Sequence, residues 1–167
     1  MKKKLVMLLS VFSMLTMVSC GASEAFKNGV KDGVQKAMQT TNLDKLDWEK
    51  CIHETKEELL NPEFFGYVKD LYIEVNQNEK KITFTAELND STNLETAKEY
   101  ADTLIRRFNL SAVSQNNEIK SASKEYYGGI YDYYDINIGI APSSKIDNIS
   151  DWYVNERIKK GSFKKIN

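Results

Sequence analysis

Few residues of this 167-residue chain could do chemistry, and two of them, Cys51 and His53, lie close together. A thiolate and an imidazole can form a nucleophilic pair or share a metal ion. The surrounding apolar spacing is helical, however, and residues two positions apart on a helix point about 200° away from each other. We therefore predict that Cys51 is a small core residue and that His53 is solvated, with neither catalysis nor metal binding at this pair.

The carboxylates form no evident catalytic pair. Asp132 and Asp135 fall on opposite faces of an expected strand, whereas Glu57 and Glu58 are neighbours on a helix surface. Glycoside hydrolysis, by contrast, needs two carboxyl groups that converge on one bond. A glycine-rich phosphate loop, a nucleophile elbow and metal-ligand spacing are also absent from the sequence. We therefore expect no cofactor and no metal, and a non-catalytic protein is favoured over an enzyme.

The densest unusual cluster is rich in tyrosine and runs from 126 to 135. On a strand, Tyr131, Tyr133 and Asp135 would share one face, because alternate residues point the same way. Tyrosine offers a large ring and a hydroxyl group, which suits recognition of a protein, a peptide or a glycan. The alternative is that these rings are core residues that lie under the C-terminal tail with Trp152 and Tyr153.

The N-terminus has the layout of an export signal. Three lysines at 2–4 precede the apolar run Leu5–Val18, and no further charge appears before Glu24. Fourteen residues make about 21 Å of helix, which is shorter than a bilayer core of about 30 Å. An extension to Ser23 would reach about 28 Å, so length alone leaves a retained anchor helix open. A basic start, a short apolar middle and a small-residue exit together favour a signal peptide.

The exit of this segment reads Met17-Val18-Ser19-Cys20-Gly21. It resembles the lipobox of bacterial lipoprotein precursors, with Met17 at the position where leucine is commonest. The resemblance implies that cleavage falls between Ser19 and Cys20 and that the sulfur of Cys20 carries lipid. The alternative is an ordinary secretory signal with a chance cysteine near its end.

This resemblance defines the expected organisation of the chain. Residues 1–19 would be a cleaved signal peptide, 20–23 a lipid attachment point with a short tether, and 24–167 a single domain. Lipid on Cys20 would attach the protein to the extracytoplasmic side of the cell membrane. In a Gram-negative cell this membrane could be the outer membrane. Because Cys20 would carry lipid, Cys51 would have no disulfide partner.

Charge excludes one class of partner. The whole chain has 23 basic and 24 acidic side chains, and three of the lysines belong to the leader. The mature protein would therefore have a net charge of −4. A non-specific nucleic-acid binder needs a basic face, so no nucleic acid is expected as a partner.

The segment from Ser23 to Gln39 is expected to form a first helix. It carries a row of small residues at every fourth position: Ala25, Gly29, Gly33 and Ala37. Glycine costs a helix about 1 kcal/mol against alanine, which close packing against another element would offset. The partner could be a second helix, the sheet or another copy of the chain. A loose tether between lipid and domain is the alternative.

The periodicity of the remaining sequence predicts a hairpin between two helices. A helix over 43–60, capped by Asn42 or Asp44, ends at Asn61-Pro62. Strands over 67–76 and 82–88 alternate around a polar loop and have one wet face. A helix over 94–108 follows, with a capping box at Thr92 and Glu95 and a terminal cap at Asn109.

Less regular elements complete the expected fold. A short strand over 110–113, a flexible loop and a long strand over 130–140 follow, and 149–160 is expected to be helical, with an edge strand as the alternative. The predicted class is α+β, with the order α-α-β-β-α-β-tail. The hairpin and the long third strand would form a small antiparallel sheet packed against amphipathic helices.

These observations favour a lipid-anchored extracytoplasmic lipoprotein that displays a small non-catalytic binding domain. Its ligand would be a protein or another component of the cell envelope. The alternatives are an envelope-acting enzyme with carboxylate chemistry and an assembly component that self-associates through its first helix.

Overall fold

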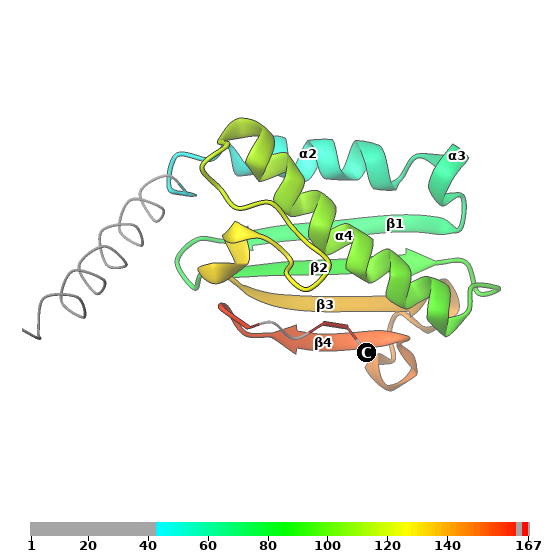
Figure 1. Cartoon of the computed structure of the whole chain (residues 1–167). Helices are drawn as coiled ribbons and strands as arrows, with labels where there is room; N and C mark the ends of the chain where they lie inside the picture. Colours follow the sequence, from blue (N-terminus) through cyan, green and yellow to red (C-terminus); the bar gives the residue numbers. More distant parts are fainter. Residues whose placement is uncertain (1–42, 163–164, 167) are drawn as a thin grey trace, which may run out of the picture. The chain divides into compact units, whose positions relative to one another are not determined.

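A mixed four-stranded sheet organises the computed structural model, which describes residues 43–162 and 165–166. The strands follow one another across the sheet in chain order: β1 (Val68–Asn76), β2 (Lys81–Leu88), β3 (Asp135–Pro142) and β4 (Val154–Ile158). Helices α2 and α4 lie together on one side of this sheet (Figure 1). The α+β class and the order α-α-β-β-α-β are therefore confirmed.

The β1–β2 hairpin follows directly from its alternating sequence. Leu71 and Ile73 on β1 are buried, while Tyr72 and Glu74 between them are exposed. The buried side chains of β2 are every second residue, namely Ile82, Phe84, Ala86 and Leu88. One face of the hairpin is therefore buried and the other is wet, as the period of two predicts.

The pairing of the next strand differs from expectation. β2 and β3 are parallel, with Phe84 opposite Ile138, so the sheet is mixed and the prediction of an antiparallel sheet is wrong. A parallel pair requires a crossover connection, and α4 (Leu94–Gln115) supplies it. β4 then runs antiparallel to β3, which makes β1 and β4 the two edges.

Helix α4 begins and ends at other residues than predicted. The cap is Asn93, whose side chain accepts a hydrogen bond from the backbone nitrogen of Thr96 at 2.8 Å, rather than Thr92 with Glu95. The helix continues to Gln115, so the predicted strand over 110–113 is helical. Buried Ser111 and Ala112 extend its packed face by one more turn.

Asn109 is a central feature of α4 instead of its cap. Its side chain is fully buried and joins α4 to the following loop, because Nδ2 donates to the carbonyl oxygen of Lys120 at 3.1 Å and Oδ1 accepts from the nitrogen of Ile130 at 3.2 Å. Gly128 lies against this side chain with φ +122°, and a Cβ there would approach the Asn109 Cγ to 2.1 Å. The loop therefore depends on these two residue types.

Helix α2 (Trp48–Leu59) starts at Trp48, five residues after the predicted start at 43. Its cap is Asp47, which accepts from the nitrogen of Lys50 at 3.0 Å, and not Asn42 or Asp44. Asn61 and Pro62 end it as predicted, and Pro62 then begins the short helix α3 (Pro62–Phe65). Proline is well placed there because its missing N–H has no role in a first turn.

The predicted long third strand is shorter at its start. Gly129–Asp132 form the 3-10 helix η1, and β3 begins at Asp135. The tail is an edge strand, β4, preceded by the short turns η2 (Ser143–Lys145) and η3 (Ile149–Asp151), so the alternative of an edge strand is right and the helix over 149–160 is wrong.

The core lies between the sheet and the two long helices. Trp48 of α2 stacks on Phe108 of α4 with ring centroids 6.3 Å apart, and Phe108 meets Phe84 of β2 edge to face at 5.3 Å. Cys51 is fully buried in this core, as predicted. Within the described residues it is present as a free thiol.

Candidate functional site

Tyr131 is a core residue, so the predicted binding surface of Tyr131, Tyr133 and Asp135 is wrong. The Tyr131 side chain is 6% exposed, and its hydroxyl donates to the carbonyl oxygen of Ile105 at 2.7 Å. Burial also raises the pKa of this phenol well above its ordinary value. The error has a physical cause: Tyr131 lies in η1, where the strand alternation that put these three residues on one face does not apply.

Asp135 has a structural role. Its carboxylate accepts from the backbone nitrogen of Lys160 at 2.9 Å and pairs with Arg157 at 2.8 Å and Lys159 at 3.2 Å. The backbone donor first, and the two cationic side chains after it, lower the pKa of Asp135 to about 2. A carboxylate with three partners in its own chain is occupied in fastening the tail to β3.

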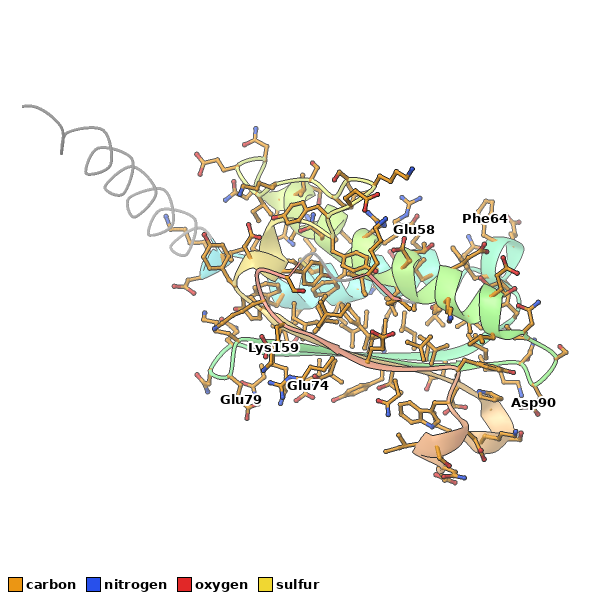
Figure 2. The ribbon with its side chains drawn as sticks, turned by 60° about the horizontal axis from the view of Figure 1, so that its bottom comes forward. Glu58, Phe64, Glu74, Glu79, Asp90 and Lys159 are labelled. Atoms are coloured by element: carbon orange, nitrogen blue, oxygen red, sulfur yellow. The ribbon has the colours of Figure 1, made fainter. Side chains whose placement is uncertain are left out.

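The sheet instead exposes a different surface, on the side away from α2 and α4. Figure 2 shows Glu74 on this side of the sheet, away from the helices. We call it the open face. Its central residues are Tyr72, Glu74, Thr83, Thr85, Asn137, Gly139, Asn155 and Arg157, and the same alternation places Asp70, Asn76, Lys81, Glu87, Asp135 and Ala141 around them.

Two cross-strand rows make up the centre of the open face. One row runs from Tyr72 through Thr85 and Gly139 to Asn155, and the neighbouring row runs from Glu74 through Thr83 and Asn137 to Arg157. Residues opposite each other on paired strands lie side by side, so each row is a continuous line of side chains. The middle of these two rows is therefore uncharged. Glu74 and Arg157 stand at the ends of one row, and the flanking rows carry Asp70, Glu87, Lys81 and Asp135.

Trp152 covers part of the open face at Gly139. A Cβ on Gly139 would lie 2.0 Å from Cζ3 and 2.6 Å from Cε3 of the indole, so only glycine allows this approach. The indole nitrogen donates to the carbonyl oxygen of Ile146 at 3.0 Å, which holds the ring over the strand. The segment that carries Trp152 projects from the sheet on the side opposite the helices (Figure 2).

Most polar side chains at the centre of the open face make no hydrogen bonds within the fold. Among the described residues, Tyr72, Thr83, Thr85, Asn137 and Asn155 make no side-chain hydrogen bond to another part of the chain. Tyr72 is 52% exposed. These hydroxyl and amide groups are available to an incoming ligand.

A separate feature is a cavity of about 180 Å³ between α2 and α4. Its walls consist of three residues of α2 and four of α4: Glu54, Thr55, Glu58, Arg107, Leu110, Ser111 and Ser114. Thr55 is almost completely buried, and its Oγ1 has no hydrogen-bond partner within the described residues. A buried hydroxyl without a protein partner is commonly satisfied by water.

The two carboxylates of this cavity are both engaged. Glu58 pairs with Arg107 at 3.1 Å across the helices, and Glu54 accepts a hydrogen bond from the Ser111 hydroxyl and pairs with Lys50 at 3.7 Å. A ligand or substrate would have to displace these internal partners. The open face imposes no such exchange.

Cys51 and His53 do not meet, as predicted. Burial raises the pKa of the Cys51 thiol to about 11 and keeps it protonated, while the exposed His53 faces Glu57 at 3.4 Å on the outer side of α2. Residues 43–162 with 165–166 contain no group of three or more His, Cys, Asp or Glu side chains that could hold a metal ion.

The other predicted sites lie outside the described residues. These are the cleavage site at Ser19 and Cys20, the lipid attachment at Cys20, and the helix-packing row of Ala25, Gly29, Gly33 and Ala37.

Sequence reasoning missed Tyr72 and Trp152 as candidate site residues. The alternation over 67–76 already placed Tyr72 on the wet face of the hairpin, so a signal for its exposure was present. The approach of Trp152 to Gly139 joins residues of a turn and a strand, and no local pattern encodes it.

Comparison with known proteins adds no family. No family model matches the chain, and neither a curated protein nor a solved structure matches it.

Proposed function

We propose that this protein is a bacterial lipoprotein, anchored through lipid on Cys20, that displays a non-catalytic binding domain outside the cytoplasmic membrane. The observation that carries the anchoring is the sequence Met17-Val18-Ser19-Cys20 at the end of a short apolar leader. Two or three acyl chains on one cysteine satisfy the requirement that stable anchoring takes more than one chain. Within the described part of the chain, no helix is long and apolar enough to cross a bilayer.

The binding role rests on the open face. Its uncharged middle combines polar groups without internal partners with a half-exposed Tyr72, whereas the tyrosine cluster and Asp135 are occupied by the fold. Exposed aromatic and hydrogen-bonding groups on a rigid sheet suit recognition, because little ordering entropy is lost on binding. The domain would present this face to a component of the envelope.

Fractionation of cells that express the Cys20→Ser variant tests the anchor. We expect the wild-type protein to incorporate labelled palmitate and to sediment with membranes, and the variant to lose the label and to leave the membrane fraction or to retain an uncleaved leader. The Cys51→Ser variant is the matched control and should keep both label and membrane location. A Cys20→Ser variant that is processed at the same site and still sediments with membranes would refute lipidation.

A further inference from the structure

We infer that the open face binds an uncharged glycan chain, with Tyr72 and Trp152 as two stacking platforms and the hydroxyl and amide groups between them as hydrogen-bonding partners. This inference rests on the proposed function, since it names the class of ligand for the same face.

The spacing of the two rings carries the first step. Tyr72 is on β1, and Trp152 lies over Gly139 on β3, with Thr85 of β2 between them in the same row. Neighbouring strands are about 4.8 Å apart, so the two platforms are about 10 Å apart along the row. That distance corresponds to alternate rings of an extended β-1,4-linked oligosaccharide, with one sugar ring between the two that stack.

The chemistry between the platforms carries the second step. Thr85 and Asn155 lie in the row of Tyr72, and Thr83 and Asn137 lie in the row beside it. A threonine hydroxyl and an asparagine amide each both donate and accept hydrogen bonds, as sugar hydroxyls do. Because none of the four side chains has a hydrogen bond within the described residues, a glycan can pair with them without breaking contacts of the fold.

Charge carries the third step. The middle of the open face has no ionisable group besides the Tyr72 phenol. Glu74, Asp70 and Glu87 border it, and the cations that border it are paired, Arg157 with Asp135 and Lys81 with Glu79. An anionic polymer would meet Glu74 without a free cation in these two rows, so polyanions are disfavoured. A protein partner is also disfavoured, because interface cores bury large apolar side chains and this face offers threonine and asparagine instead.

Titration of the purified full chain in detergent tests the inference. The probes are cellotetraose and the β-1,4-linked tetramer of N-acetylglucosamine, with a hyaluronate tetrasaccharide as the anionic counterpart. Binding is measured by calorimetry and by tryptophan fluorescence. The chain has two tryptophans, and Trp48 is buried, so a change in fluorescence reports mainly on Trp152. We expect at least one uncharged probe to bind and the anionic probe to bind at least about tenfold more weakly.

Matched variants separate stacking from general effects on the fold. Tyr72→Ala should weaken binding at least about tenfold, whereas Tyr72→Phe should stay within about twofold, because the ring is retained. Thr85→Val should weaken binding about fivefold, since one hydrogen bond is lost. Phe64→Ala is the control, because Phe64 is an aromatic residue that is 72% exposed on α3, away from the open face. Its affinity should be unchanged, and circular dichroism should show each variant folded.

Two outcomes would overturn the inference. One is the absence of binding by both uncharged probes, and the other is a folded Tyr72→Ala variant with unchanged affinity. Capture of a protein at the open face in place of a glycan would likewise refute it. Absence of glycan binding in this titration would not change the outcome of the Cys20→Ser fractionation. Absence of lipidation would likewise not change the outcome of the titration, so the two experiments distinguish failure of one proposal from failure of the other.

Discussion

Asp135 shows how one carboxylate can fasten a whole terminus. It lies at the first position of β3 and holds the end of β4 and the residues after it through one backbone donor and two cationic side chains. Hydrogen bonds to a charged group contribute more than neutral ones, about 1.5–3 kcal/mol. The same residue was a candidate for ligand binding from sequence alone, because an aspartate on a strand carries no local sign of its partners.

Replacement of Asp135 by asparagine should destabilise the domain by about 2 kcal/mol at neutral pH. The pKa of the carboxyl is lowered from 3.8 to about 2 in the folded state, so its contribution is complete above about pH 5 and is lost as the pH falls through about 2. Urea unfolding of wild type and Asp135→Asn between pH 6 and pH 2 measures this. The two proteins should differ at pH 6 and converge towards pH 2, and a constant difference across that range would contradict the assignment. Asp151→Asn, in an exposed turn, is the control.

The buried hydroxyl of Thr55, which has no hydrogen-bond partner within the described residues, is a second feature of a single residue that the sequence did not predict. Thr55 lies on the buried side of α2 with Trp48, Cys51 and Leu59, at helical spacing. Whether a buried hydroxyl finds a partner depends on the atoms of other elements around it, and here those atoms belong to α4 and the cavity beside it.

At the scale of elements, α4 and the loop that follows it form one unit. Arg106 extends this unit: it pairs with Asp102 at 2.6 Å, donates to the carbonyl oxygens of Ser123 and Tyr126, and lies over the Tyr127 ring at 5.0 Å. The structure places it mid-helix, where the loop folds back onto it.

The buried Asn109 should be the stronger of the two connections to this loop. Asn109→Ala removes two hydrogen bonds and leaves the Ile130 nitrogen and the Lys120 oxygen without their partner, so we expect a loss of about 2–3 kcal/mol in the free energy of unfolding. Hydrogen exchange should accelerate over residues 116–130 before it does in the sheet. Asn155→Ala, an exposed asparagine without a side-chain hydrogen bond, is the matched control and should have little effect. Equal losses for the two variants would refute the role of Asn109.

At the scale of the whole molecule, the sheet divides the described domain into two sides with different tasks. The side under α2 and α4 holds the core, including Tyr131, whereas the other side is left open apart from the segment that carries Trp152 (Figures 1 and 2). A helical layer on one side and a solvated sheet on the other explains why alternate residues of β1 and β2 differ so strongly in polarity.

Burial in this single core should control the reactivity of Cys51. In the Cys20→Ser background Cys51 is the one remaining cysteine, it is fully buried, and burial raises the pKa of its thiol to about 11. We expect a maleimide at pH 7.5 to label it only through opening of the core, and rapidly once urea unfolds the chain. The double variant Cys20→Ser, His53→Cys adds an exposed thiol two residues away and should label at once. Native labelling of Cys51 at the rate of the unfolded chain would contradict its place in the core.

The sequence by itself determined the features that depend on neighbours along the chain. Periods of 3.6 and 2 located α2, α4 and the β1–β2 hairpin, and the proline at 62 ended α2, because each of these follows from the geometry of a few consecutive residues. Tertiary structure alone decided the parallel pairing of β2 with β3, the burial of Tyr131, the connections of Asn109 and the approach of Trp152 to Gly139. Each of these joins residues far apart in the chain, and their free energy comes from packing and hydrogen bonds that no local period records.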